Sequence, residues 1–453
     1  MRPAARKTLA GGAFATAGAR IVSIALMAGV TIVVARSLGP VGNGRYALVA
    51  ATFLFLLTLA KLGIELGAPW LVSSGHWPVG SAFVTTQAAA LSIGAAVAGL
   101  GAAAFTLLPP ELFGGVDLVD GLPVLAAVPF ALAATYSAQI ALATVEYSVS
   151  ALILVVQALA WFVGVAVLTP AVGLEGAFIG LLVGQVAGFV VSLDWGRRLI
   201  RRRDNDVLAT ARVDIANLRR AMAFGLRAHG ANVLALVTYR FDLFMVAAYA
   251  SKADVGYYAV ALAATNLVWL LPSALSAVLF PRISALAAAG EAQKAEDVET
   301  RSLQHTTILL SVAVLAMAFA LPLLLQAIFG ARFGPAVHLA LILLPGSAAL
   351  GFASVFYAAL SGRGHPGYAF RGALIVTPLA VVLYVLLIPP FHATGAAIAS
   401  SIAYVAAAVV AGTFARHLTD LPVVSRLVPG RNQLMDYQEL LRRFAPGRSG
   451  GSC

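Results

Sequence analysis

The chain is built from long apolar runs that carry almost no charge. Runs of about 20 apolar residues are long enough, as α-helices, to cross the roughly 30 Å hydrocarbon core of a membrane. Of the 453 residues, 60% are hydrophobic and 11% are charged, whereas soluble domains average about 45–50% apolar and 25% charged residues. The runs are too long for the alternating strands of a membrane β-barrel. We therefore expect an all-α polytopic membrane protein.

About twelve transmembrane helices can be delimited. The first run follows three basic residues, but it is longer than the apolar region of a typical signal peptide, so we interpret it as an uncleaved span. The expected bounds are 9–35, 46–72, 80–108, 121–143, 149–170, 174–195, 222–248, 256–280, 304–328, 336–360, 367–389 and 393–415.

Basic residues are distributed unevenly between the two sides of the membrane. With the N-terminus in the cytoplasm, the segments on that side hold 22 of the 30 Lys and Arg residues, which supports cytoplasmic placement of both termini. A basic connector at 197–221 contributes most to this asymmetry. We expect it to contact anionic lipid headgroups and not nucleic acid. In the basic tail, 416–453, the sequence "MDYQELLRRF" predicts an interfacial helix.

An internal repeat divides the spans into two sets of six. A shift of 212 residues relates "VVARSLGPVGNGRYALVAA" (33–51) to "MVAAYASKADVGYYAVALAA" (245–264), and it aligns Gly44 with Gly256. The shift relates each span to the sixth span after it. Because six is an even number, the two halves have the same orientation in the membrane, and a pseudo-twofold axis along the membrane normal relates them. We expect six-helix lobes at 1–196 and 222–415.

Several charged or polar side chains lie within the spans. A charged residue at a helix centre costs roughly 2.5–3.5 kcal/mol on insertion scales, so it should face a cavity, a partner or water. Arg20 lies on a polar stripe of the first span, and the 212 shift aligns it with Asn232 in the seventh. Arg227 and Arg240 also lie in the seventh span. We expect these four side chains to face a central cleft between the lobes.

A second group of ionisable residues is a candidate for ion coupling or cavity pairing. Lys61 and Glu65 lie four residues apart, which predicts an ion pair on one helix. His229 is either a proton-sensitive switch or a hydrogen-bonded structural histidine. Asp242 lies near the outer end of its span, where solvation at headgroup level is the simplest expectation.

Enzymatic chemistry has no support in the sequence. The chain contains no Walker A, HExxH or nucleophile-elbow motif, and the single cysteine, Cys453, excludes a CxxC site. The longest outer loop, 109–121, is too short for the catalytic domain of a glycan polymerase or ligase. We expect no catalytic residues, no metal site and no cofactor.

The repeat segments resemble bacterial polysaccharide flippases of the multidrug/oligosaccharidyl-lipid/polysaccharide exporter superfamily. "VARSLGPVGNGRYALV" is similar to the junction of their first two spans. The sequence at 240–284 is similar to their seventh and eighth spans, with Asp242, Gly256, Tyr258, Pro272 and Pro281 in the family pattern. Lys61 departs from that pattern, because relatives often carry an acidic residue there.

The resemblance implies transfer of an undecaprenyl-type, pyrophosphate-linked oligosaccharide across the bacterial inner membrane by alternating access. The arginines would neutralise the pyrophosphate, coupling would use Na⁺ or H⁺, and polysaccharide polymerase or export machinery would be partners. The alternatives are a multidrug cation antiporter, a lipid II flippase, which usually has fourteen spans, and a structural scaffold. The spans contain four basic residues against two acidic ones, which favours an anionic substrate.

Overall fold

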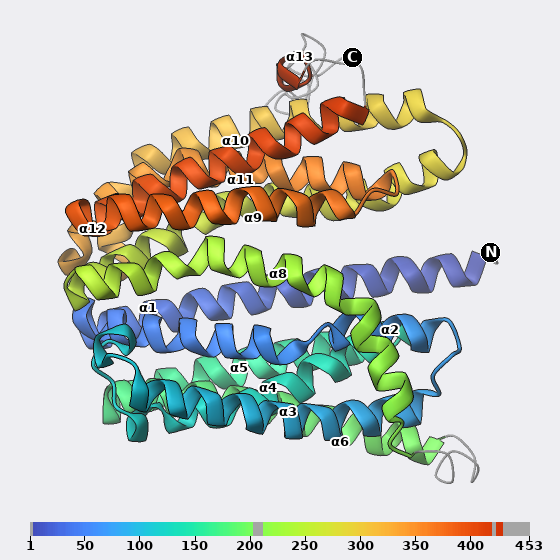
Figure 1. The fold of residues 1–453 in the computed structure, drawn as a ribbon, viewed down its shortest axis with the longest axis horizontal. Helices are drawn as coiled ribbons and strands as arrows, with labels where there is room; N and C mark the ends of the chain where they lie inside the picture. Colours follow the sequence, from blue (N-terminus) through green and yellow to red (C-terminus); the bar gives the residue numbers. More distant parts are fainter. Residues whose placement is uncertain (1–2, 203–211, 419–422, 429–453) are drawn as a thin grey trace, which may run out of the picture. The chain divides into compact units, whose positions relative to one another are not determined.

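A computed structural model describes residues 3–202, 212–418 and 423–428, with the side chains at 3–15, 200–202, 227, 423 and 424 outside the described part. Within these ranges every regular element is a helix, and there is no strand (Figure 1). The expected interfacial helix near the C-terminus lies outside the described residues. The helices are α1 (Pro3–Lys61), α2 (Ile64–Ser73), α3 (Val79–Leu107), η1 (Pro110–Phe113), α4 (Leu118–Ala143), α5 (Tyr147–Val172), α6 (Leu174–Arg202), α8 (Ile215–Tyr249), α9 (Lys252–Ala288), α10 (Ala292–Phe329), η2 (Ala331–Phe333), α11 (Gly334–Gly362), α12 (Gly367–Leu418) and α13 (Val423–Leu427).

Two of the helices each contain two spans. In the described ranges, 10 helices are long and apolar enough to cross a membrane. The helical conformation of α1 is interrupted at Gly39, with φ 66°, and that of α12 at His392, with φ 51°. Prolines beside both interruptions remove backbone donors and favour a sharp change of direction, and Figure 1 shows the chain turning back within α1. Division at these residues gives twelve segments, which confirms the all-α polytopic fold.

The second span is broken, although the sequence predicts a continuous helix over 46–72. α1 ends at Lys61, and both Leu62 (φ 48°) and Gly63 (φ 78°) have left-handed backbone conformations before α2 begins. The Gly63 carbonyl accepts hydrogen bonds from the backbone N–H groups of Leu66 and Gly67. The apolar pattern continues across this break, so hydropathy alone does not reveal it.

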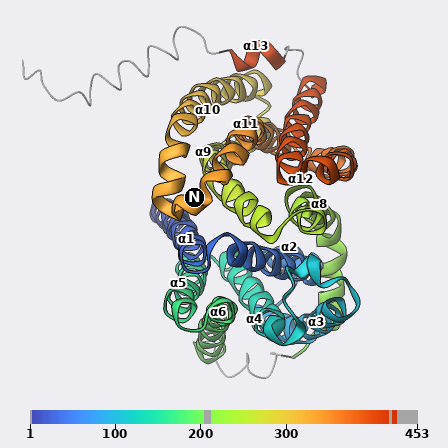
Figure 2. The ribbon, with the colours of Figure 1, turned by 90° about the vertical axis from the view of Figure 1, so that its left-hand side faces the viewer.

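The first of two compact units comprises the described parts of Met1–Ala264, together with Pro322–Ala340 and Thr377–Ser400. In this unit α3, α4, α5 and α6 pack side by side with α1 (Figures 1 and 2). Its core contains large buried side chains such as Tyr136 and Phe178. Gly164 of α5 and Gly180 of α6 face each other with no space for a Cβ atom. Such small-residue contacts are typical of membrane helices.

The second unit comprises Thr265–Leu321, Leu341–Val376 and the described part of Ser401–Cys453. Its apolar core includes Leu279, Ile283, Phe356 and Leu360. A buried ion-pair cluster also lies in this unit: Glu299 contacts Arg363, and the Arg426 Nη2 lies 2.7 Å from Glu299 Oε1. The short helix α13 is therefore held to α10 by Arg426. The expected lobe boundaries at 196 and 222 stay a prediction.

Candidate functional site

The repeat-equivalent residues Gly44 and Gly256 lie against each other in the first unit. A Cβ atom on Gly44 would collide with the Lys252 carbonyl oxygen, and one on Gly256 would collide with the Pro40 carbonyl oxygen. The 212 shift that aligns the two glycines also aligns Pro40 with Lys252. The contact is therefore reciprocal, as a local twofold axis requires. We call these four residues, with Asn43, the Gly44 seam.

Two further contacts join the halves near the Gly44 seam. Asn43 Nδ2 donates a hydrogen bond to the Gly256 carbonyl oxygen at 3.1 Å, and Asn43 is buried. Arg36, at the end of the first span, donates to the carbonyl oxygens of Ala327 and Ile328 at 2.5 and 2.7 Å. These carbonyls belong to the last turn of α10, where a cation is favourable. These contacts join the bend of α1 to the start of α9 and to the end of α10.

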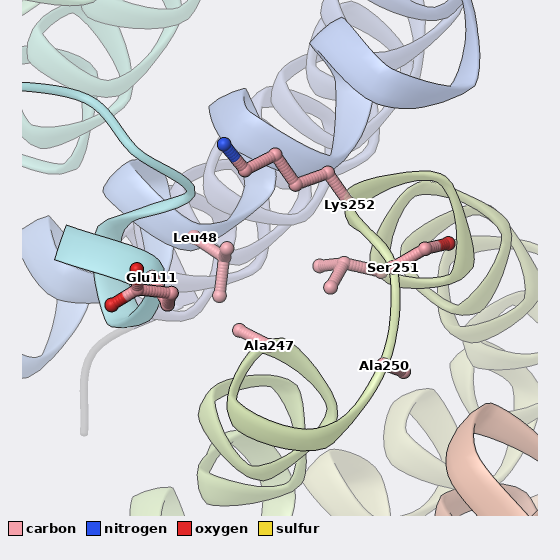
Figure 3. A pocket seen from close by; sticks show the side chains of 7 residues that line it. Leu48, Glu111, Ala247, Ala250, Ser251 and Lys252 are labelled. Carbon is pink, nitrogen blue, oxygen red and sulfur yellow. The ribbon is translucent and has the colours of Figure 1, made fainter. Parts of the chain in front are cut away.

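A pocket of about 260 Å³ lies next to the Gly44 seam, between α1, η1 and the α8–α9 connection (Figure 3). Leu48 and Ala247 lie at its centre, and the Ser251 hydroxyl points away from them. The Lys252 ammonium lies over Gly115, where a Cβ atom would come within 2.5 Å of it. The centre of the pocket is therefore apolar, with charged groups at its rim.

The second seam between the halves, the Gly63 seam, joins α2 and the broken segment before it to α8. A Cβ atom on Gly225 would collide with the Gly63 carbonyl oxygen, and one on Gly67 would collide with the Ala221 carbonyl oxygen. Gly63 also needs its positive φ of 78°, which glycine adopts at little cost. Close backbone contact and the helix break thus occur at one residue.

Glu65 pairs with His229 across the Gly63 seam, and not with Lys61. Glu65 Oε1 lies 3.3 Å from His229 Nδ1, and the two residues are 7% and 5% exposed. The expected Lys61–Glu65 ion pair is wrong for a physical reason: the four-residue spacing applies within one helix, and the break at 62–63 separates them. Lys61 still contributes a longer-range electrostatic attraction to Glu65. The Tyr136 hydroxyl donates to the Lys61 carbonyl oxygen at 2.9 Å, which fixes the broken segment.

Asp242 of α8 is fully buried, so the expected headgroup-level solvation is wrong. Its Oδ2 accepts hydrogen bonds from the Tyr258 hydroxyl at 2.5 Å and from the Ser400 hydroxyl at 3.0 Å, and its Oδ1 accepts from the Leu243 N–H at 2.8 Å. Tyr258 and Ser400 are also 0% exposed. In the described part of the chain, no Lys, Arg or His nitrogen lies within ion-pair distance of Asp242.

Buried hydroxyl groups extend this network beyond Asp242. Tyr384 Oη lies 3.2 Å from Ser400 Oγ and donates to the Thr238 carbonyl oxygen at 2.6 Å. Thr238 and Thr377 are joined through their hydroxyls at 2.8 Å. We call Asp242 and these five hydroxyl residues the Asp242 cluster. The sequence analysis identified Asp242 but missed its partners, although the match of Tyr258 to Tyr46 in the repeat was a signal for one of them.

The predicted substrate-binding residues have different environments. Arg20 and Asn232 are exposed, and Arg240 is partly buried and electrostatically attracted to Asp242. Among the described residues Arg20 and Arg240 have no ion pair with another helix. The side chain of Arg227 lies outside the described part. The binding role of these residues stays a prediction.

Comparisons with known proteins agree on family and fold. A family described as polysaccharide biosynthesis protein matches residues 33–338. A curated relative from Haloferax volcanii, a probable low-salt glycan biosynthesis flippase, is 24% identical over 251 residues. That match covers 55% of this chain and 51% of the relative, so the chain spans about half the length of the curated relative that it matches.

Solved structures show which fold the chain shares. An inward-facing multidrug resistance transporter of the MATE family superposes with a TM-score of 0.74 at 15% identity, covering 89% of this chain and 94% of that one. The lipid II flippase MurJ, in an inward closed conformation, gives a TM-score of 0.72 at 14% identity and covers 96% of this chain and 93% of its own. At these identities the similarity establishes the fold alone.

Proposed function

Since the chain belongs to the polysaccharide biosynthesis protein family, we propose that it is a flippase for a lipid-linked oligosaccharide. The expected substrate is an undecaprenyl-type pyrophosphate carrier, moved across the bacterial inner membrane with both chain termini in the cytoplasm. The glycan flippase among its relatives supports this substrate class. The same proposal includes polysaccharide polymerase or export machinery as partners and anionic lipids at the basic connector.

The single observation that carries the proposal is an exposed arginine without a partner inside a membrane span. Arg20 lies in the Thr16–Lys61 segment and has no ion-pair partner among the described residues. Keeping such a cation in a span is costly without a compensating anion or water. A pyrophosphate supplies that anion, and the planar guanidinium group binds phosphate oxygens through paired hydrogen bonds. Arg227, Arg240 and Asn232 complete the proposed binding set.

The proposal assigns energy coupling to two buried sites of the first unit, the Asp242 cluster and the Glu65–His229 pair. The Asp242 cluster offers a carboxylate and several hydroxyl oxygens, the oxygen ligands that hard cations such as Na⁺ prefer. The Glu65–His229 pair, with Lys61 nearby, offers groups that exchange protons. In the proposed cycle the halves alternate access around the two seams, and ion binding favours one of the two arrangements.

The experiment that tests the function is deletion followed by complementation. We expect lipid-linked oligosaccharide to accumulate on the inner leaflet while the surface polysaccharide disappears. Wild-type protein and the control Arg301→Ala, at an exposed arginine outside the proposed binding set, should restore export, whereas Arg20→Ala should not. Normal export by the deletion strain, with altered drug tolerance, would contradict the proposal and indicate a multidrug cation antiporter.

The MATE-like fold makes that antiporter the second candidate. Its cationic substrates would favour a carboxylate-lined site, whereas the carboxylates of Glu65 and Asp242 are buried and already hydrogen-bonded. A lipid II flippase is the third candidate, and its substrate shares the pyrophosphate chemistry. Export of labelled lipid II by proteoliposomes, in preference to lipid-linked oligosaccharide, would favour it.

A further inference from the structure

A second pocket, which the proposed transport cycle does not use, lies between the α4–α5 turn and the end of α6. It measures about 680 Å³ and is lined by polar and apolar residues in comparable proportion. Glu146, Asp194 and Arg198 supply its charges, and Leu152 and Val191 supply part of its apolar wall. The pocket lies at the same end of the spans as the basic connector that follows α6. We call it the Glu146 pocket.

A hydrogen bond to Trp195 positions the Glu146 side chain in this pocket. Its Oε2 accepts a hydrogen bond from Trp195 Nε1 at 2.7 Å, and Trp195 is itself buried against the edge of Phe83. The preceding residue, Val145, has φ 65°, a left-handed conformation that β-branched residues rarely adopt. Strained backbone of this kind is concentrated at functional sites. The turn thus fixes Glu146 beside Trp195.

Among the described residues, the charges in the pocket leave the Glu146 carboxylate without a cationic partner. Arg198 Nη2 lies 2.7 Å from Asp194 Oδ2, so these two groups pair with each other. Glu146 has a neutral N–H donor and, among the described residues, no cation within ion-pair distance. A carboxylate at the edge of a membrane protein with only one neutral donor favours a cationic ligand. Arg198, with 65% of its side chain exposed, remains available to an anion nearby.

An exposed apolar strip leads away from the pocket along α5. Its residues follow steps of 7, 4 and 4, which place them on one face of the helix. Because lipid tails are as apolar as these side chains, such a strip in a membrane protein contacts acyl chains. The strip starts at the pocket wall and consists of Leu152, Leu159, Val163 and Val167, which are 53%, 46%, 48% and 63% exposed.

The geometry points to a binding site for an aminophospholipid in the Glu146 pocket. The primary ammonium of the headgroup would donate hydrogen bonds to Glu146, the phosphate would contact Arg198, and an acyl chain would follow the α5 strip. A primary ammonium group has three N–H donors, whereas a choline headgroup has none and a glycerol headgroup has no cation. The site therefore selects phosphatidylethanolamine over phosphatidylcholine and phosphatidylglycerol. This inference is independent of the transported substrate.

Native mass spectrometry of the full chain tests the site. The protein is released from nanodiscs containing equal amounts of the three phospholipids with identical acyl chains, and retained lipids are counted. We expect retention of phosphatidylethanolamine above the other two. Glu146→Gln keeps an acceptor for Trp195 but removes the charge, and it should lower the preference about tenfold. The matched control is Glu175→Gln, the same substitution at an exposed glutamate at the opposite end of α6.

Equal retention of the three lipids by the wild type, or equal preference in Glu146→Gln and Glu175→Gln, would overturn the inference. If Glu146→Gln does not fold, the wild type decides the question with phosphatidylethanolamine methylated stepwise at nitrogen, since retention should fall with each lost N–H donor. A further experiment measures whether soluble phosphoethanolamine displaces the bound lipid. Phosphoethanolamine should not displace the lipid at equal concentration, because it lacks the chain that follows α5. Displacement would show that the headgroup binds alone and would refute the lipid site.

Discussion

Tyr46 and Tyr258 occupy equivalent positions of the two halves, yet their hydroxyl groups form different hydrogen bonds. One accepts from a neutral donor, and the other donates to a carboxylate. Tyr46 Oη accepts a hydrogen bond from Trp161 Nε1 at 3.2 Å, and its ring stacks on Phe178. Tyr258 Oη donates to the buried carboxylate of Asp242 at 2.5 Å. The 212 shift places Val30 at the position of Asp242, and Val30 is buried among apolar side chains.

The difference shows that the repeat preserves the scaffold while only the second half carries a carboxylate at this position. Burying an ionised carboxylate is costly unless it is fully hydrogen-bonded, and the second half provides the donors from α9 and α12. The first half achieves the same packing with apolar and aromatic side chains. We infer that both halves contribute to the seams and to helix packing, whereas the Asp242 cluster is formed by the second half alone.

The largest expected effect comes from breaking the reciprocal contact that both halves share. Gly44→Val and Gly256→Val should each lower the free energy of unfolding by about 3 kcal/mol, because the new side chain meets a backbone carbonyl. Thermal unfolding followed by tryptophan fluorescence measures the loss. The control is Gly18→Val, since no atom lies within 4 Å of a Cβ atom there. Very different losses at Gly44 and Gly256 would contradict the local symmetry.

Asp242→Val makes the second half resemble the first and should remove ion-coupled transport. It leaves the Tyr258 and Ser400 hydroxyls without their acceptor, at a cost of about 1–3 kcal/mol in stability. Flipping by proteoliposomes under a Na⁺ or H⁺ gradient, compared with no gradient, provides the readout. Asp254→Asn serves as the control, because within the described part of the chain the Asp254 carboxylate bonds only to Ser251 in its own turn. Gradient-dependent flipping that survives in Asp242→Val would place the coupling elsewhere.

Paired tyrosine substitutions sharpen the comparison at the level of a single hydrogen bond in each half. Tyr258→Phe removes a hydrogen bond to a carboxylate and should cost about 1.5–3 kcal/mol, whereas Tyr46→Phe removes a neutral bond and should cost about 0.5–1.5 kcal/mol. Each variant is compared with the wild type by its unfolding midpoint in the same detergent. An equal loss of stability in the two variants would mean that the hydrogen bond from Tyr258 to the Asp242 carboxylate is no stronger than the neutral bond of Tyr46.

A further expected effect concerns Asn43, the member of the Gly44 seam whose side chain forms a hydrogen bond across it. Asn43 corresponds to Val255 under the 212 shift, so Asn43→Val makes these two equivalent positions identical while removing the bond to the Gly256 carbonyl. The expected loss is about 1 kcal/mol, measured by the same unfolding assay. Asn43→Ser, which keeps a donor of shorter reach, tests whether the bond or the volume matters. A loss as large as that of Gly44→Val would show that Asn43, and not the glycine contact, holds the seam.

Sequence patterns predicted most of the fold because they depend on local quantities. The twelve spans follow from run length and hydropathy, and the pairing of Gly44 with Gly256 in the repeat follows from sequence identity. The candidate site was predicted only in part. Asp242, Glu65 and His229 were recognised because ionisable groups in apolar runs are conspicuous, but the partner proposed for Glu65 was wrong.

By itself the sequence determined that this protein crosses the membrane many times and contains two related halves, since the bilayer imposes a length and hydropathy that single segments must satisfy. Only the tertiary structure decided which groups meet. The left-handed backbone at Leu62 and Gly63 separates Glu65 from Lys61, and helix packing brings Ser400 to Asp242 across 158 residues. Such contacts depend on how whole helices are rotated and where they are broken, which no local sequence pattern encodes.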